Sequence, residues 1–250
     1  MGDPLRLYGL NALVLNAAGG IGEAIARTLI KHGATVLAVD SQNSGVQQHF
    51  ASVKGITGVT ATLTEPERMP AVVEEAAKKL GGIDILVNDF PLHPETPLAH
   101  ADDRLERLLQ LRAELMLQTC RAALPHIKKS PAGRIINIGF LRSIFSADGA
   151  QASARAEQDL RNLTRALAAE TGEFGITANY IQPGAVMTPS SREVFRKDKT
   201  LRDYCIEGSA ARRLGEPVDV AKVALFLASD DAVFVSGTGI AVDGGRTHPD

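Results

Sequence analysis

Short runs of apolar residues alternate along the chain with longer stretches in which apolar residues recur every three or four positions. The short runs predict buried strands, and the longer stretches predict amphipathic helices. Strands separated by helices are typical of βαβ units, in which parallel strands are buried on both faces. The strands expected from this pattern are 12–15, 35–39, 58–62, 83–87, 134–138, 176–181 and 239–242, and the main helices are 22–32, 66–80, 105–124, 152–171 and 218–228.

One segment breaks the alternation without suggesting a second domain. Residues 188–212 are mostly polar and are typical of a loop-and-helix lid that covers a site. The chain shows no internal repeat, linker or low-complexity tract. The pattern therefore predicts a single domain over residues 1–250, with the lid as an excursion from it.

The charge and cysteine content narrow the range of partners. The 27 basic and 29 acidic side chains leave a net charge of -2, which argues against a nucleic-acid or anionic-membrane footprint. Cys120 and Cys205 are the two cysteines, too few for a disulfide framework or a zinc site. No apolar run approaches the ~18 residues of a membrane span. We expect a cytoplasmic protein with no metal, no nucleic acid and no membrane contact.

A glycine-rich turn joins the first expected strand to the first helix and contains Asn16, Gly20, Ile21 and Gly22. Glycine lets the backbone approach a diphosphate, and the helix N-terminus that follows supplies N–H donors and a positive dipole end. Asp40 ends the second strand about 20 residues further on, where a carboxylate accepts from ribose hydroxyls and repels a 2′-phosphate. These residues favour NAD over NADP, although the same glycines also allow tight strand–helix packing.

Further motifs follow in order along the rest of the chain. Residues 84–88 read Asp-Ile-Leu-Val-Asn, 134–138 read Arg-Ile-Ile-Asn-Ile, 213–217 read Arg-Leu-Gly-Glu-Pro, and 242–245 read Val-Asp-Gly-Gly. Together with the glycine turn they resemble the short-chain dehydrogenase/reductase family over nearly the whole length. The resemblance implies a Rossmann-like, doubly wound α/β domain with a seven-stranded parallel sheet and helices on both faces. It also implies hydride transfer between a nicotinamide and a carbonyl or alcohol.

The resemblance also assigns positions to the family's catalytic Ser, Tyr, Lys and Asn. Counted without gaps from the flanking motifs, these positions hold Phe140, Ser153, Glu157 and Arg112, respectively.

A shifted alignment does not restore the missing residues. The chain has no tyrosine between Tyr8 and Tyr180 and no lysine between Lys129 and Lys197. Arg155 is similar to the arginine that the related halohydrin dehalogenases use. It lies two positions from the lysine slot, however, and so nearly on the opposite side of a helix. The acid–base pair of the family is therefore missing from this region.

The replacements also remove the chemistry of these positions. A serine hydroxyl titrates far above any working pH, so Ser153 cannot donate the proton that a tyrosine would. Glu157 puts a carboxylate where a cation would face the nicotinamide ribose, and Phe140 puts an apolar ring where an oxygen would orient the substrate. We predict no catalytic residue at these slots.

The cofactor-binding positions are altered as well. Asn88 is followed by Asp89, Phe90 and Pro91, where the family has Asn-Ala-Gly, so a bulky ring and a ring-locked backbone stand close to the expected nicotinamide. Asn16 replaces the first glycine of the turn, although asparagine tolerates a left-handed backbone. We predict that this chain binds no dinucleotide and that the vestige of its site is Asn16, Gly20, Ile21, Gly22, Asp40 and Asn88.

The two long helices predict association with another subunit. In the family the corresponding helices pair across a two-fold axis, and the last strand with its preceding helix forms a second interface. Helix 105–124 carries an apolar surface too broad to bury on one sheet. The prediction is a catalytically silent subunit that joins an active paralogue, which binds the NAD, in a hetero-oligomeric alcohol or hydroxyacyl-CoA dehydrogenase of four subunits. Heteromeric hydroxyacyl-CoA dehydrogenases of anaerobic aromatic degradation, with one subunit lacking the catalytic residues, are the members it resembles most.

Two other functions stay open on the sequence. One is an autonomous oxidoreductase, or a cofactor-free lyase or dehalogenase, with relocated catalytic residues such as His93, Asp89 or Glu157. His93 stands between two prolines and is more typical of a solvated loop histidine. The other is a small-molecule sensor that uses the vacated pocket.

Overall fold

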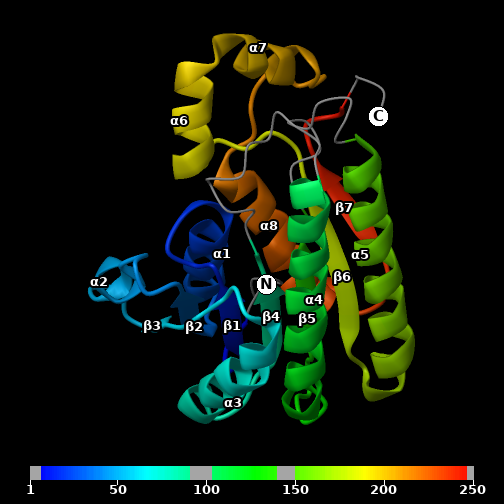
Figure 1. Ribbon diagram of the computed structural model, residues 1–250. Coiled ribbons are helices and arrows are strands. Elements are labelled where there is room, and N and C mark those ends of the chain that lie inside the picture. Colours follow the sequence, from blue (N-terminus) through cyan, green and yellow to red (C-terminus); the bar gives the residue numbers. More distant parts are fainter. Residues whose placement is uncertain (1–6, 91–102, 140–149, 247–250) are drawn as a thin grey trace.

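A computed structural model of the chain describes residues 7–90, 103–139 and 150–246. Its centre is a parallel sheet of seven strands in the order β3-β2-β1-β4-β5-β6-β7 (Figure 1). The seven-stranded parallel sheet predicted from the resemblance is thereby confirmed. The strands are β1 (Asn11–Leu15), β2 (Thr35–Asp40), β3 (Ile56–Thr60), β4 (Ile85–Asn88), β5 (Arg134–Ile138), β6 (Thr177–Pro183) and β7 (Gly239–Val242).

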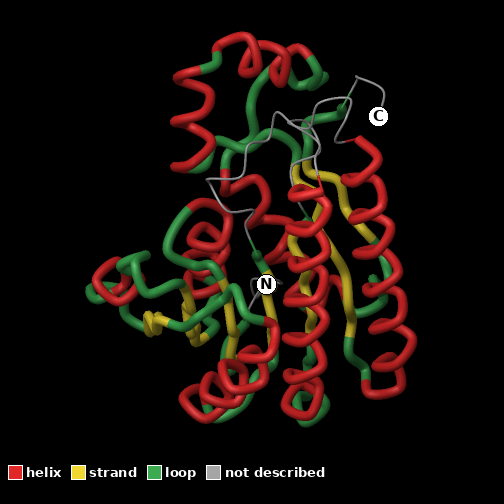
Figure 2. The backbone as a smooth tube through the Cα atoms, in the orientation of Figure 1, coloured by secondary structure: helices red, strands yellow, loops and turns green. Residues whose placement is uncertain are grey.

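Helices cover both faces of the sheet (Figure 2). The first core cluster packs α1, α2 and α8 on one face, and the second packs α3, α4 and α5 on the other. The lid helices α6 and α7 lie beyond the carboxyl end of β6, at the top of Figure 1. The helices are α1 (Gly20–Lys31), α2 (Val46–Phe50), α3 (Met69–Leu80), α4 (Asp103–Ile127), α5 (Ala150–Thr171), α6 (Pro189–Lys197), α7 (Lys199–Glu207) and α8 (Pro217–Ala228).

The two-residue period of the strands separates these two cores. In β1, Ala12 and Val14 face the α1/α8 side, while Leu13 and Leu15 face the α3/α4/α5 side, and all four are fully buried. Burying a leucine side chain contributes about 1.5–3 kcal/mol. A strand that is apolar on both faces can therefore only lie inside a sheet covered on both sides.

Several expected boundaries differ from the structure, and two of these differences have a physical explanation. We expected Pro125 to end the long helix, but α4 continues to Ile127 with the proline inside its last turn. Pro125 and Arg121 are both exposed, so water can reach the Arg121 carbonyl that the proline leaves without an N–H partner. The third strand, expected at 58–62, spans Ile56–Thr60, because its register on β2 begins with the pairing of Ile56 with Val36.

The described residues contain neither a helix that could span a membrane nor a cluster of metal ligands. Within residues 7–90, 103–139 and 150–246, no helix is long and apolar enough to cross a membrane. The same residues contain no group of three or more His, Cys, Asp or Glu side chains placed to hold a metal ion.

Candidate functional site

The carboxyl ends of β1 and β4 meet at the point where the strand order reverses. Ligands of doubly wound sheets bind in the crevice at this switch point. The turn after β1 has a left-handed backbone at Asn16, with φ 55°, and at Gly20, with φ 62°. A Cβ on Gly22 would lie 2.2 Å from the Asn16 carbonyl oxygen, so only glycine fits there. The turn therefore has the tight strand-to-helix shape that its sequence predicts.

Asp89, directly after β4, places its carboxylate at this turn. Its Oδ2 accepts a hydrogen bond of 3.3 Å from the Asn16 side-chain amide. The backbone N–H of Gly22, in the first turn of α1, also hydrogen-bonds to it. Burial raises the pKa of Asp89 to about 6, against the opposing effects of the Arg112 charge and of these hydrogen bonds. A carboxylate of the chain itself thus lies at the positive end of the α1 dipole.

Asp40, at the end of β2, also bonds to the backbone of the turn. Its Oδ2 accepts from the N–H of Ala18 at 2.7 Å, and its Oδ1 accepts from the N–H of Ser41 at 2.6 Å. The side chain is buried, with 6% of its surface exposed. Both carboxylate oxygens that we expected to face a ribose therefore have a partner within the chain.

The lid reaches the same turn at its N-terminal end. Thr188 caps α6 and forms a capping box with Ser191. A Cβ built on Gly20 would lie 3.1 Å from the Cγ2 of Thr188, and one on Gly19 would lie 4.0 Å from the Cγ of Pro189. The first residues of α6 therefore lie close to the glycine turn and leave little room for a side chain on Gly20.

Arg112, on α4, extends between the ends of two central strands. Its guanidinium donates to the backbone oxygens of Phe90, after β4, and Ile138, the last residue of β5. Burial lowers the pKa of Arg112 to about 10, and attraction to Asp89 opposes this, so the side chain stays charged at neutral pH. Counting along the sequence had placed Arg112 at the family's Asn position, but its hydrogen bonds to both strand ends come only from the structure.

The family's Tyr and Lys positions, here Ser153 and Glu157, are on α5, which packs on the same face of the sheet as α4. Glu157 is buried, with 9% exposed, and its Oε1 lies 3.6 Å from a guanidinium nitrogen of Arg161. Ser153 is half-buried, one turn before it on the same helix. Arg155 points the other way and forms an exposed ion pair of 2.9 Å with Glu106, which confirms that it does not face the lysine slot.

Other predicted residues lie away from the turn or outside the described residues. The Asn88 amide donates to the Asn137 side-chain oxygen at 2.8 Å and to the Cys120 sulfur at 3.2 Å, in the core beneath the strand ends. Burial raises the pKa of Cys120 to about 12, so this thiol is inert. Phe140 and His93 lie outside the described residues.

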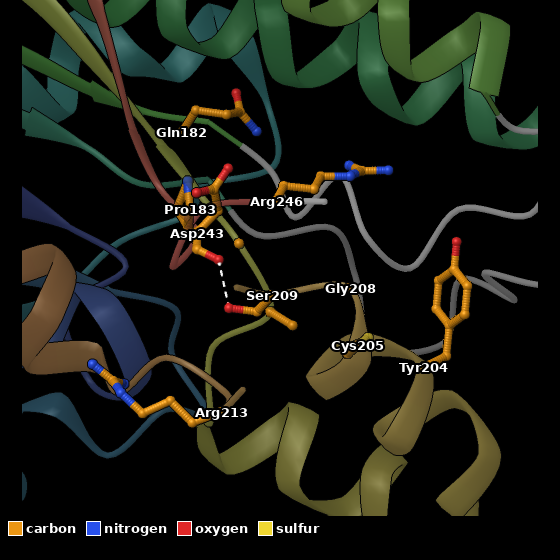
Figure 3. Close-up of a pocket in the computed structure, with 11 residues that line it drawn as sticks. Gln182, Pro183, Tyr204, Cys205, Gly208, Ser209, Arg213, Asp243 and Arg246 are labelled. Atoms are coloured by element: carbon orange, nitrogen blue, oxygen red, sulfur yellow. Dashed lines mark hydrogen bonds between the residues drawn. The ribbon is translucent and has the colours of Figure 1, made fainter. Parts of the chain in front are cut away.

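A second feature lies between the ends of β6 and β7 and the lid helix α7 (Figure 3). The Ser209 hydroxyl donates to the Asp243 backbone oxygen at 3.2 Å, and the backbones of Ser209 and Arg246 form an antiparallel bridge. This partly open cavity of about 30 Å³ has room for one or two water molecules, so it is not substrate-sized. The lid segment was expected here from its composition, but its backbone pairing with the end of β7 was not.

Comparison of the sequence with known proteins assigns the chain to a family. A family model described as enoyl-(acyl carrier protein) reductase matches residues 16–247. The uncharacterized oxidoreductase C922.06 of Schizosaccharomyces pombe is 32% identical over 245 residues, 96% of this chain and 92% of that protein. Oxidoreductase UcpA of Escherichia coli is 31% identical over 256 residues, 98% of this chain and 97% of that protein. The chain belongs to the short-chain dehydrogenase/reductase family.

Solved structures of family members have the same fold. A protein provisionally described as an NAD(P)-dependent gluconate 5-dehydrogenase, from Beutenbergia cavernae, is 30% identical, with a TM-score of 0.84 over 97% of this chain and 98% of that chain. It holds NADP at low occupancy. A provisional gluconate dehydrogenase from Agrobacterium tumefaciens is 26% identical, with a TM-score of 0.85 over the same shares of the two chains. The family is thus one of oxidoreductases that use NAD(P).

The groups at the turn do not fit a dinucleotide in this short-chain dehydrogenase/reductase. A diphosphate needs free N–H donors at the α1 N-terminus and space above the glycines. Here the Gly22 N–H bonds to Asp89, the Ala18 N–H bonds to Asp40, and Thr188 lies so near Gly20 that a Cβ there would meet its methyl group. The backbone retains the shape of a phosphate-binding turn, but these donors and this space are used by the chain.

Proposed function

We propose that this chain is a catalytically silent subunit of a short-chain dehydrogenase. It assembles with an active paralogue, and the NAD is bound by that partner. The resulting hetero-oligomer, of four subunits, oxidises an alcohol or a hydroxyacyl-CoA. Its role in the complex is structural or regulatory. The heteromeric dehydrogenase of anaerobic toluene degradation that acts on 2-(hydroxy(phenyl)methyl)succinyl-CoA is the arrangement that this proposal takes as its closest parallel.

The observation that carries the proposal is the side chain of Arg112. At the position of the family's Asn, its guanidinium is bound to the backbones after β4 and at the end of β5. At the Tyr and Lys positions, Ser153 offers no acid of suitable pKa, and Glu157 offers no cation for a ribose. Hydride transfer needs a proton donor beside the carbonyl, and none of these three side chains supplies one.

The face that supports assembly is a groove between α4 and α5 with a volume of about 450 Å³. Its lining is mainly apolar, and half of the lining residues are partly exposed. Glu114 and Asp159 also line the groove, and both of these charged residues are exposed. Covering apolar surface contributes about 25 cal/mol per Å², which favours a partner helix on this face. The apolar lining residues are Leu109, Ala113, Leu117, Ala156, Leu160 and Leu163.

A second face adjoins the edge strand β7. In the described sheet this strand pairs with β6 alone, so its other edge is open. Phe234 is fully exposed and Val233 is 58% exposed in the connection that leads to it. An unpaired edge with exposed apolar side chains is a surface that association would cover.

Co-expression tests the proposal. The chain, tagged, is produced alone and together with a short-chain dehydrogenase from the same genome that has intact Ser, Tyr and Lys residues. We expect no NAD reduction by the pure chain with a panel of alcohols and hydroxyacyl-CoA thioesters. We expect the two chains to co-purify in equal amounts as a complex that reduces NAD.

A matched pair of variants locates the contact. Leu117 lines the groove without packing into either core, so Leu117→Glu should leave folding intact and weaken co-purification at least tenfold. Val194→Glu, on the lid helix α6, is the control and should have no effect. Alcohol-dependent NAD reduction by the pure chain would contradict the proposal, as would unchanged association of the Leu117→Glu chain.

A cofactor-free acid–base enzyme is the second candidate, and one observation favours it. Asp89 is buried in the crevice with its pKa raised to about 6, which suits a group that exchanges protons near neutral pH. If this function were correct, the pure chain would turn over a substrate without dinucleotide, and Asp89→Asn would abolish the turnover. The silent-subunit proposal predicts no activity in that assay.

A further inference from the structure

The N-terminus of α1 is the natural anion site of this fold, because its first N–H groups have no partner within the helix. In this chain the anion that reaches it is the Asp89 carboxylate. The Asn16 amide holds one carboxylate oxygen at 3.3 Å, and the Gly22 N–H hydrogen-bonds to the same side chain. No side chain caps this helix from its own N-cap residue, Gly19. The capping anion therefore comes from the neighbouring strand, β4.

A buried carboxylate needs a compensating charge, and Arg112 supplies it. The two side chains attract each other, and both are buried, with 8% and 7% of their surfaces exposed. Asp40, the other charged group that acts on Asp89, repels it from the end of β2. Arg112 is in turn held by the backbone oxygens of Phe90 and Ile138. The pair thus connects α1, β4, α4 and β5 across the crevice.

The first residues of the lid helix α6 lie near the glycines of the turn, which Asp89 and Arg112 do not cover. Thr188 and Pro189 lie near the turn, so that a Cβ on Gly20 would come within 3.1 Å of the Thr188 Cγ2 and one on Gly19 within 4.0 Å of the Pro189 Cγ. A diphosphate placed on the turn would have to displace the Asp89 carboxylate from the Gly22 N–H and move the start of α6 away from the glycines. Either change would expose buried groups that are now satisfied.

We infer that Asp89 and Arg112 act together as a built-in replacement for the dinucleotide. Asp89 takes the place of a phosphate at the α1 N-terminus, and Arg112 balances its charge while joining the strand ends that a bound cofactor would contact. The chain thereby completes its own crevice without a ligand. This inference rests on the proposed function in one respect: a silent subunit performs no hydride transfer and needs no dinucleotide.

The test is a set of variants that return both positions to asparagine, the residue type that the family has at each. Asp89→Asn, Arg112→Asn and the double variant are compared with the parent chain. Asp203→Asn, an exposed carboxylate-to-amide change on α7, is the control. Circular dichroism reports folding, thermal unfolding reports stability, and NADH fluorescence reports binding.

Each single variant removes one charge of a buried pair of opposite sign, so we expect the melting temperature to fall by roughly 5–10 °C. The double variant should lose less than the sum of the two single losses. It should also bind NADH saturably, whereas the parent chain should show no saturable binding. The control should match the parent in both measurements.

Two results would overturn the inference. One is saturable micromolar NADH binding by the parent chain, and the other is a folded double variant that binds NADH no better than the parent. If the double variant does not fold, inorganic pyrophosphate decides the question, because a rise in the melting temperature of the parent would show that its α1 N-terminus is open to phosphate. The proposed function fails separately, through NAD reduction by the pure chain or absence of the complex.

Discussion

The glycine turn at the switch point is occupied by polar groups of the chain itself, whereas the groove between α4 and α5 leaves apolar side chains partly uncovered. At the turn, Asp40 and Asp89 bond to backbone N–H groups, and Thr188 leaves little room for a side chain on Gly20. Along the groove, apolar side chains such as Leu117 stay partly uncovered. A satisfied surface gains little from a ligand, whereas an uncovered apolar surface gains from association. This difference is what the proposed silent subunit requires, namely a cofactor turn occupied by the chain and an apolar face left uncovered.

The largest expected effect on stability comes from adding a side chain inside the glycine turn. Gly22→Ala would place a Cβ 2.2 Å from the Asn16 carbonyl oxygen, so the backbone of the turn would have to move. We expect a loss of about 1–3 kcal/mol in the free energy of unfolding, measured by urea denaturation. Gly172→Ala is the control, because a Cβ there meets nothing within 4 Å. Equal stability of the two variants would show that the turn is not tightly packed.

A smaller effect should appear in the pH dependence of stability. The pKa of Asp89 is raised from 3.8 to about 6 in the folded chain. Its contribution to stability is therefore fully present below the unfolded value and is lost as the pH rises through 6. Between pH 5 and 7 the parent chain should lose about 1 kcal/mol relative to Asp89→Asn. Denaturation of both proteins across this range measures the difference, and parallel curves would contradict it.

The smallest effect on the isolated chain should come from the second assembly face. Phe234 is fully exposed, so Phe234→Ser should change the free energy of unfolding by less than about 0.5 kcal/mol. The same change should weaken assembly, because a buried phenylalanine contributes about 1.5–3 kcal/mol. Light scattering after size-exclusion chromatography measures the assembly. A variant that unfolds early would show that Phe234 belongs to the fold and not to an interface.

Much of the fold followed from the apolar pattern, because strands buried on both faces have a composition that few other structures share. The predicted strands 134–138 and 239–242 match β5 and β7 residue for residue. The weaker signal of β3 led to an error of two residues at its start. Pro125 misled the prediction because a proline in an exposed last turn costs less than one within the helix.

The site was only partly predictable. Counting from motifs assigned Arg112, Ser153 and Glu157 to the catalytic positions of the family, and the left-handed backbone of Asn16 was anticipated from its residue type. Asp89 was considered only as a relocated acid or base. Its place on the α1 N-terminus depends on β4 lying beside β1, two strands that are far apart in the sequence. Asp40 was expected to face a ribose, but its bond to Ala18 depends on the fold of the turn.

The sequence by itself determined the fold class, the order of the elements and the residue types at the catalytic positions, since these depend on local pattern and spacing. It also determined that no tyrosine–lysine pair lies on α5. Only the tertiary structure decided what the replacement residues do. The hydrogen bond from Asn16 to Asp89 forms only when residues 73 positions apart meet where β1 and β4 end side by side. That meeting, with the attraction between Asp89 and Arg112, turns two substitutions into one connected pair.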